Sequence, residues 1–213
     1  MRGFSDKVLN VSSADAPSIA NTHGWHSRGY LPHFDGGPIP QNIAFRLIDS
    51  LPSVKLREWA EELANIPTER AEDERRHRID EYLDRGLGEL WLSRPAIAEL
   101  VQHSLLQFDR RRYYLHAWVV MPNHVHALIT PVAGSSLSQI LHTWKSYTAK
   151  KANDLLERKG AFWQQEYFDR YVRHEAHFED AVKYIEFNPV KAGLCTKPQD
   201  WRFSSAAWRS LKK

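Results

Sequence analysis

Two histidines stand one residue apart in the segment VVMPNHVHALIT, residues 119–130, as His124 and His126. The alternation of apolar residues around them predicts a β-strand, in which successive side chains point to opposite faces. The two imidazoles would share one face, roughly 7 Å apart along the strand, while Val125 points to the other face. Such a pair can chelate a metal ion if a third ligand comes from elsewhere. Two histidines that are hydrogen-bonded separately fit the same pattern.

A helix predicted over HEAHFEDAVKYIEFNP, residues 174–189, carries the next candidates, Tyr184 and Asn188. Its apolar residues recur at the spacing of one buried helix face. Tyr184 and Asn188 are four positions apart beside that face, so they are neighbours on the helix surface. If the apolar face packs on a sheet, this pair lies at the sheet's margin and could reach a metal ion. An ordinary packed tyrosine, and an asparagine that ends the helix before Pro189, are the alternatives.

Taken together, the segments MPNHVHAL and YIEFNPVKAGL resemble the single-tyrosine HUH transposases, and most closely the REP-associated tyrosine transposases. The resemblance extends over roughly residues 28–208, through RGYLPHFD, FRLIDSLP, TWKSYTAK, FWQQEYFDRYV and WRFSSA. It implies that Tyr184 is the nucleophile and that the metal ligands are His124, His126 and Asn188. It also implies an α+β fold, with a central antiparallel sheet flanked by helices in a ferredoxin- or RRM-like arrangement.

The resemblance further implies a transposase reaction on single-stranded DNA that carries hairpin-forming or palindromic repeats. The tyrosine hydroxyl cleaves the strand, forms a 5′-phosphotyrosine intermediate and releases a 3′-hydroxyl, so that the strand can be rejoined elsewhere. Neutral imidazole and amide ligands suit Mg²⁺ or Mn²⁺ with open positions, although imidazole also accepts zinc. A second copy of the chain is an open alternative as a partner, since a dimer could place Tyr184 opposite the other copy's histidines.

The predicted helix between residues 136 and 160 is basic. Its cations could follow DNA phosphates, and a solvated helix face explains them equally well. The candidates are Lys145, Lys150, Lys151, Arg158 and Lys159. Tyr147 lies on the same segment and is the alternative nucleophile; Tyr167 and Tyr171 are further tyrosines near the predicted sheet edge.

The chain order also predicts the organisation of the molecule. Residues 1–39 are polar and rich in turn formers, which predicts a mostly irregular arm. Residues 40–213 would form a single HUH transposase domain that starts with a strand at NIAFRLID. Within it, residues 53–86 are dense in charge and predict two helices broken near Pro67, an insertion most simply explained by a solvated face. A role of this insertion in DNA binding or oligomerisation stays open.

Composition limits the class of protein. The 213 residues have a net charge of +3 and a single cysteine, Cys195. One cysteine excludes an internal disulfide and a cysteine cage for zinc, and it fits a reducing compartment. No run approaches the roughly 18 apolar residues of a membrane span. We therefore expect no membrane partner and a cytoplasmic, nucleoid-associated protein.

Three other functions fit parts of the pattern. A domesticated nucleic-acid-binding regulator could keep the same fold without cutting DNA. A replication initiator or plasmid relaxase would belong to the wider HUH group, whose members often carry larger accessory domains. A hydrolytic zinc enzyme would use the histidines and would not need Tyr184.

Overall fold

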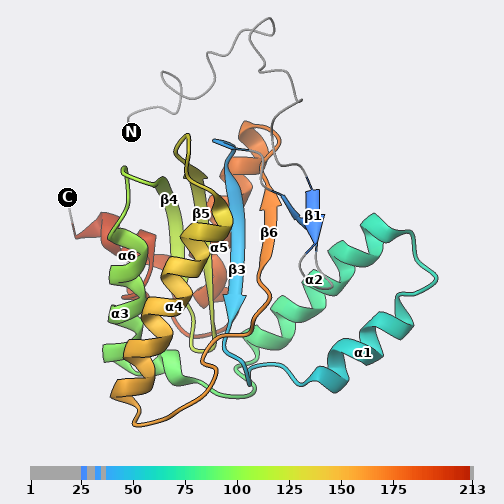
Figure 1. Ribbon diagram of the computed structural model, residues 1–213, viewed down its shortest axis with the longest axis horizontal. Helices are drawn as coiled ribbons and strands as arrows, with labels where there is room; N and C mark the ends of the chain where they lie inside the picture. Colours follow the sequence, from blue (N-terminus) through green and yellow to red (C-terminus); the bar gives the residue numbers. More distant parts are fainter. Residues whose placement is uncertain (1–24, 28–31, 35–36, 212–213) are drawn as a thin grey trace, which may run out of the picture.

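The computed structural model describes residues 25–27, 32–34 and 37–211 (Figure 1). Its main sheet has four strands in the order β4-β5-β3-β6, and every neighbouring pair is antiparallel. The strands are β3 (Gln41–Arg46), β4 (Tyr113–Val120), β5 (His124–Pro131) and β6 (Phe168–Tyr171). The predicted α+β fold with a central antiparallel sheet is confirmed.

Two helices connect these strands in a ferredoxin-like pattern. Helix α3 (Pro95–Leu106) leads from the β3 side of the chain to β4, and α4 (Leu137–Leu155) leads from β5 to β6. The chain order β-α-β-β-α-β and the spatial order with β3 and β5 at the centre are those of a split β-α-β fold. The predicted hairpin at MPN is also present, because β4 and β5 are joined by residues 121–123.

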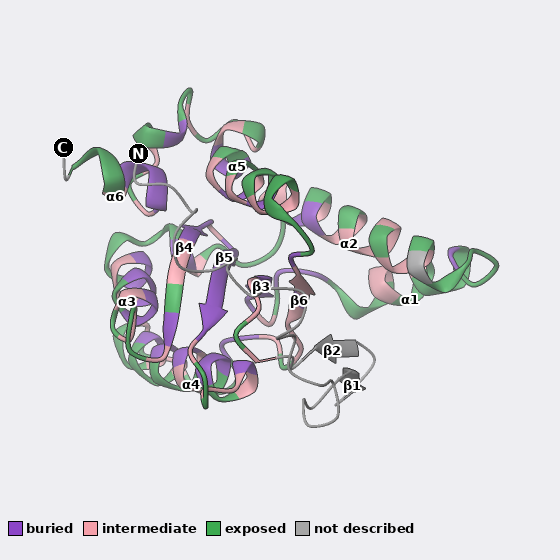
Figure 2. Ribbon diagram, turned by 90° about the horizontal axis from the view of Figure 1, so that it is seen from above, coloured by how far each residue is buried: buried purple, intermediate pink, exposed green. Residues whose placement is uncertain are grey.

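Helices α3 and α4 cover one face of the sheet, and that face holds the larger core (Figure 2). Apolar side chains alternate along each strand, so Ile43 and Phe45 of β3 and Val125 and Ile129 of β5 all point into it. An irregularity between Leu115 and Ala117 in β4 shifts the register by one residue. A bulge of this kind moves the following side chains to the opposite face, so Trp118 joins the larger core and Ala117 the other.

Helix α5 (Glu175–Lys191) covers the opposite face of the sheet with a smaller core (Figure 2). Its predicted apolar side packs there through Ala181 and Ile185. The helix that was predicted to stop near Pro189 continues two residues further, to Lys191, with Pro189 inside it. Proline removes one backbone donor, yet the helical hydrogen bonds resume at once, with Ala192 N donating to Asn188 O at 2.9 Å. Asn188 is thus a buried residue inside the last turns of the helix, and not its terminator.

The charged insertion forms two helices, α1 (Ser53–Glu62) and α2 (Thr68–Asp84), with Pro67 immediately before α2. The predicted break near Pro67 is confirmed. The two helices contact each other through the rings of Trp59 and Tyr82, whose centroids are 6.1 Å apart. Figure 1 shows them beside the β3–β6 edge of the sheet, on the side away from α3 and α4.

The remaining described elements are short. Strands β1 (Trp25–Ser27) and β2 (Pro32–Phe34) pair inside the segment predicted as an irregular arm, and the rest of that arm up to residue 36 lies outside the described residues. The 3₁₀ turns η3 (Trp91–Ser93) and η4 (Pro198–Asp200) precede α3 and α6 (Ser205–Ser210), respectively. In the described part of the chain, no helix is long and apolar enough to cross a membrane.

Candidate active site

Both histidines of the His-x-His segment lie in β5 and face the α5 side of the sheet. Their strand partners on β3 are Arg46 for His124 and Ala44 for His126. The two imidazole rings are perpendicular, with centroids 4.8 Å apart, and their residues are 1% and 0% exposed. Val125 between them is buried in the opposite core. Period-two alternation of the strand therefore brings the imidazoles together, as predicted.

The orientation of His124 is set by the residue before it. Asn123 is fully buried, and its side-chain Nδ2 donates to the backbone oxygens of Leu83 and Leu87, at 3.1 and 3.2 Å. The amide oxygen of Asn123 then lies 2.7 Å from Nδ1 of His124. An oxygen only accepts hydrogen bonds, so Nδ1 carries the hydrogen and Nε2 keeps a free lone pair. This is the tautomer that coordination of a metal ion through Nε2 requires.

Several buried polar atoms around the histidines have no hydrogen-bond partner among the described residues. They are His124 Nε2, both ring nitrogens of His126, and both amide atoms of Asn188. Buried polar groups are nearly always paired, and an orphan of this kind needs an explanation such as a bound ion. Burial also lowers the pKa of His126 to about 3 and that of His124 well below its usual 6.5, so both imidazoles are neutral at pH 7.

This donor set fits a divalent metal ion. Within the described residues, no group of three His, Cys, Asp or Glu side chains is arranged to hold a metal ion. Neutral imidazoles and an amide oxygen supply lone pairs without bound protons, which is what coordination requires.

Tyr184 lies on α5, one turn before Asn188, and its ring packs against His126. The two ring centroids are 5.5 Å apart and the planes are nearly perpendicular, at 87°. The hydroxyl of Tyr184 donates a hydrogen bond to Oδ2 of Asp80 at 2.7 Å. Burial, and then the adjacent Asp80 carboxylate, raise the pKa of Tyr184 above its usual 10, so the side chain is a neutral phenol at pH 7. A single chain therefore brings the tyrosine and both histidines together.

Helix α2 forms a wall of this site, which corrects the expectation that the charged insertion is only a solvated face. Arg76, Asp80 and Asp84 recur every four residues along one side of the helix and point toward the sheet and α5. Arg76 Nε lies 3.8 Å from Asp80 Oδ2, and its guanidinium stacks over the ring of Phe168 at 4.3 Å. Burial lowers the pKa of Arg76, while Asp80 opposes that shift.

Asp84, the last residue of α2, lies between two candidate site residues. Its Oδ2 is 3.1 Å from the ammonium of Lys191 on α5, and its Oδ1 is 3.9 Å from Nε2 of His124. Burial raises the pKa of Asp84, and Lys191 opposes the shift. Sequence reasoning missed both Asp80 and Asp84. The four-residue recurrence of Arg76, Asp80 and Asp84 was the available signal, but charged helices that face solvent have the same spacing.

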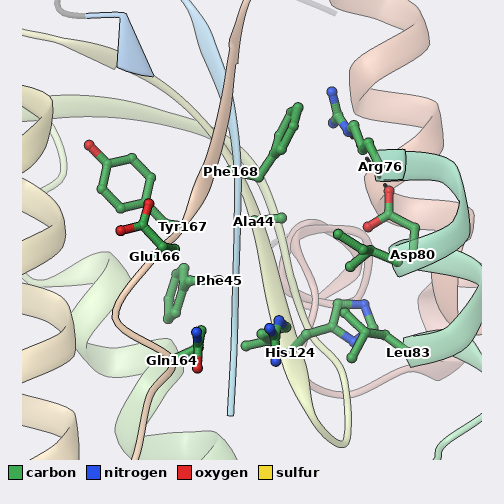
Figure 3. Close-up of a pocket in the computed structure, with 12 residues that line it drawn as sticks. Ala44, Phe45, Arg76, Asp80, Leu83, His124, Gln164, Glu166, Tyr167 and Phe168 are labelled. Carbon is green, nitrogen blue, oxygen red and sulfur yellow. Dashed lines mark ion pairs between the residues drawn. The ribbon is translucent and has the colours of Figure 1, made fainter. Parts of the chain in front are cut away.

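Two hollows give access to these residues. A cavity of about 50 Å³ lies between β3, the segment 164–168 and α2, with His124 and Asp80 in its wall (Figure 3). Figure 3 shows Asp80 turned toward Arg76, with His124 below them beside Leu83. An open groove of about 290 Å³ runs between α2, β6 and α5, and its lining includes Tyr184, Asp80, Arg76 and Arg170. The tyrosine is therefore accessible from a surface with both basic and acidic groups.

The basic residues predicted as a DNA track are not gathered at this site. They lie on or after α4, which covers the other face of the sheet. The Lys145 ammonium donates to the backbone oxygens of Gln164 and Gln165, at 2.8 and 2.6 Å, and burial lowers its pKa to about 8. Arg158 donates to Ala161 O and Asn153 Oδ1 and stacks over Trp91 at 3.9 Å. Lys150, Lys151 and Lys159 are exposed.

The other tyrosines that the sequence singled out are not on α5, although Tyr167 lines the same cavity as His124. Tyr147, the alternative nucleophile, is 51% exposed on α4, across the sheet from the imidazoles. Tyr167 packs against the larger core, and Tyr171 lies in the edge strand β6. Only Tyr184, among the tyrosines that the sequence singled out, has its ring against His126.

Comparisons with known proteins relate this chain to transposases. The family model Y1_Tnp, described as "Transposase IS200 like", matches residues 94–188. That range includes β4, β5, α4, β6 and α5 as far as Asn188, and it leaves α1 and α2 outside. The REP-associated tyrosine transposase of Escherichia coli (strain K12) is 28% identical over 108 residues, which are 50% of this chain and 63% of that protein.

A solved structure of the same kind shares the fold. Its title is "Structure of the REP associates tyrosine transposase bound to a REP hairpin", and it aligns with a TM-score of 0.52 at 20% identity. The alignment covers 84% of this chain and 81% of that one. Motifs, family model and fold thus agree, and the similarity of this chain to the REP-associated tyrosine transposases, predicted from its residues, is confirmed.

Proposed function

We propose that this protein is a transposase that cleaves and transfers single-stranded DNA through a covalent bond to Tyr184. One observation supports this most directly: the Tyr184 ring packs 5.5 Å from that of His126, in a site where imidazole and amide groups are buried without partners. A tyrosine with a purely structural role does not need unpaired imidazoles beside it. A tyrosine that attacks a phosphate bound to a metal ion needs them, because the imidazoles would hold that ion.

The residues that fit a divalent ion are His124, His126 and Asn188, and Mg²⁺ or Mn²⁺ match their donor types. Such an ion would polarise a non-bridging oxygen of the scissile phosphate and offset the charge that develops there. All three ligands are neutral, so the ion would keep its full charge for the phosphate.

The chain's own residues account for the covalent step. Tyr184 is a phenol at neutral pH and a poor nucleophile until its proton is removed. Asp80 already accepts the hydrogen bond of that hydroxyl at 2.7 Å, so it is positioned to take the proton. The tyrosine oxygen forms a bond to phosphorus, the bond from phosphorus to the 3′ oxygen breaks, and that oxygen takes a proton from solvent. The 5′ end stays on Tyr184 until a 3′-hydroxyl reverses the step.

The proposed substrate is single-stranded DNA with hairpin-forming repeats. The structural relative is bound to a REP hairpin, and the net charge of +3 is compatible with a polyanion. Since one chain contains both the tyrosine and the histidines, we propose that cleavage takes place within one subunit. A homodimer is then not required for the chemistry.

The test is formation of a covalent adduct with labelled hairpin-bearing single-stranded DNA in Mn²⁺ or Mg²⁺. We expect a protein–DNA adduct that is stable to denaturant, that is lost in EDTA, and that is absent in Tyr184→Phe. Tyr147→Phe is the matched control and should retain the adduct. Hairpin binding without any adduct, unaffected by chelator, would instead support the non-cutting regulator. An adduct that persists in Tyr184→Phe would contradict the assignment of the nucleophile.

A further inference from the structure

Arg76 on helix α2 is a mostly buried cation that makes no hydrogen bond to the described residues. Its side chain is 13% exposed, its ion pair with Asp80 is 3.8 Å long, and its guanidinium lies over the Phe168 ring. Arg170, which also lines the groove between α2, β6 and α5, is already paired with Asp73 at 3.0 Å. A guanidinium carries five N–H donors, and buried charges are normally hydrogen-bonded. The donors of Arg76 therefore need a further acceptor.

The open groove brings Arg76 next to the tyrosine that we propose as the nucleophile. Arg76 and Tyr184 both line this groove. Oδ2 of Asp80 accepts the hydrogen bond of the Tyr184 hydroxyl at 2.7 Å and lies 3.8 Å from Arg76 Nε, so both groups flank one carboxylate oxygen. Reacting atoms lie about 3–3.5 Å apart before an attack. A phosphate at that distance from the tyrosine oxygen is large enough to reach the guanidinium as well.

The register of the sheet places Arg76 on the same face as the imidazoles. Ala44 of β3 is opposite His126 of β5 on one side and Phe168 of β6 on the other. Side chains directly opposite each other on neighbouring strands share a face, and Figure 3 shows Ala44, Phe168 and Arg76 on one side of β3. These three residues also line the cavity of about 50 Å³. Only the methyl group of Ala44 thus separates His126 from the ring beneath the guanidinium.

We propose that Arg76 is a catalytic residue that binds a non-bridging oxygen of the scissile phosphate through its guanidinium. The proposal deepens the function proposed above and rests on it. While the Tyr184 oxygen bonds to phosphorus and the bond from phosphorus to the 3′ oxygen breaks, the guanidinium stabilises the charge on the non-bridging oxygens. Arginine suits this role because its planar N–H groups match the geometry of a phosphate. The insertion, which lies outside the residues matched by the family model, then supplies a cation to the reaction.

The contact should strengthen as the reaction proceeds. Before the attack, Arg76 faces the carboxylate of Asp80. When Asp80 takes the proton of the tyrosine it loses its negative charge, so the guanidinium interacts with the phosphate alone. An interaction that is stronger in the transition state than in the ground state raises the rate of the reaction.

The experiment compares the rates at which the full chain and its variants form the adduct with hairpin-bearing single-stranded DNA in Mn²⁺. We expect Arg76→Gln to slow this rate on the order of 10²-fold, the effect of removing one stabilising donor from a transition state. Arg76→Lys keeps the charge but not the planar donors, so its rate should lie between those of the parent and Arg76→Gln. Arg78→Gln is the matched control, because this guanidinium pairs with Glu62 and Glu74 on the α1 side of α2. It should react as the parent does.

Phosphorothioate substrates test the contact itself. In the two stereoisomers, sulfur replaces one or the other non-bridging oxygen of the scissile phosphate, and sulfur accepts hydrogen bonds only weakly. For the isomer with sulfur at the position that Arg76 binds, the ratio of the oxygen rate to the sulfur rate should be at least about threefold smaller in Arg76→Gln than in the parent. The other isomer should keep its ratio. An arginine with a purely structural role would slow all substrates equally, so unchanged ratios for both isomers would overturn the proposal.

Failure of this inference and failure of the proposed function give different results. Equal rates of adduct formation in the parent and in Arg76→Gln overturn the role of Arg76 alone. A parent protein that forms no adduct in Mg²⁺ or Mn²⁺ overturns the proposed function, and with it this inference. All rates are taken per folded molecule, from the circular dichroism of each variant, so that a loss of stability is not counted as a loss of catalysis.

Discussion

The two faces of the central sheet differ in what they bury. Strand β5 contributes to both, sending Val125, Ala127 and Ile129 to one face and His124 and His126 to the other. The first face packs against α3 and α4 in an apolar core that includes fully buried rings such as Trp144. The second packs against α5 and α2 and contains buried nitrogens without partners among the described residues.

This difference teaches where stability and chemistry reside. The larger apolar core lies on the α3–α4 face, and apolar burial is the dominant favourable term in folding. Orphaned polar groups on the α5–α2 face reduce stability unless a ligand pairs with them. Val125 and Ile129 are packed in the apolar core on one side of β5, and this packing positions the imidazoles on the other side.

The largest expected effect comes from His126→Leu, which removes two orphaned nitrogens and keeps a similar volume. We expect the rate of adduct formation to fall on the order of 10³-fold, because a ligand of the ion is lost. The free energy of unfolding in EDTA should stay within about 1 kcal/mol of the parent or rise, since replacing unpaired buried polar atoms by apolar ones is nearly neutral. Urea unfolding measures the free energy of unfolding, and the adduct assay measures the rate. A large loss of stability would show that His126 supports the fold.

The complementary change, Ile129→Ala, acts on the apolar face of the same strand. Ile129 is fully buried in the larger core, so truncation should lower the free energy of unfolding by about 2–5 kcal/mol. Adduct formation per folded molecule should change little. Urea unfolding with a correction for the folded fraction tests this, and a loss under about 1 kcal/mol would contradict the contrast between the faces.

Asp80→Asn tests the proton acceptor at Tyr184. The amide can keep a hydrogen bond to the hydroxyl, but it cannot take its proton, so adduct formation at pH 7 should slow on the order of 10²-fold. The Asp80 carboxylate also raises the pKa of Tyr184, so the variant should regain rate as pH rises. The measurement is the rate of adduct formation from pH 6 to 10. Glu81→Gln, an exposed change on the same helix, is the control, and an unchanged rate in Asp80→Asn would exclude this role.

Acid should destabilise the folded protein through the buried histidines on the α5–α2 face. Burial lowers the pKa of His116 to about 4 and of His126 to about 3, so both stay neutral in the folded protein as the pH falls from 7 to 5. The unfolded chain takes up these protons below about pH 6.5 and therefore binds more of them. These two histidines therefore do not reduce the free energy of unfolding above pH 6.5. As the pH decreases toward 4, the free energy of unfolding falls by up to about 1.4 kcal/mol per pH unit for each histidine.

Urea unfolding between pH 7 and 5 measures this slope. His116→Asn should flatten it, while the same change at the exposed His142 should leave it as it is. Equal slopes in the parent and in His116→Asn would show that His116 does not contribute.

The smallest expected effect concerns the exposed lysines beyond the larger core. If Lys150 and Lys151 contact phosphates, the double change to Gln weakens hairpin binding a few-fold and lowers the salt slope by roughly 0.7 per lost contact. Fluorescence anisotropy at several salt concentrations measures both quantities. An unchanged slope would leave α4 as a solvated surface and confine DNA to the α5–α2 side.

The sequence predicted the parts of this site that depend on local periodicity. Alternation in β5 placed His124 and His126 opposite Val125, and the four-residue spacing in α5 placed Tyr184 beside Asn188. The break at Pro67 also followed from local chemistry, since proline cannot continue the preceding helix. The exact end of α5 did not, since the helix continues through Pro189 to Lys191.

Contacts between distant segments could not be predicted in this way. Tyr184 and Asp80, which are hydrogen-bonded, are 104 positions apart in the sequence. Asn123 donates a hydrogen bond to Leu83, which is 40 positions away. A charged helix has the same composition whether its carboxylates face solvent or a catalytic tyrosine. In the same way, nothing in the sequence distinguishes a lysine that binds DNA from Lys145, whose ammonium holds two backbone carbonyls.

By itself, then, the sequence determined which residues could do chemistry and which face of its strand or helix each would occupy, because side-chain direction follows from backbone geometry. Only the tertiary structure decided which groups surround them. Helix α2 packs against α5 and the sheet edge and places Asp80 at the Tyr184 hydroxyl and Asp84 at His124. These contacts depend on how separate helices and strands pack against one another, and no local sequence pattern encodes that packing.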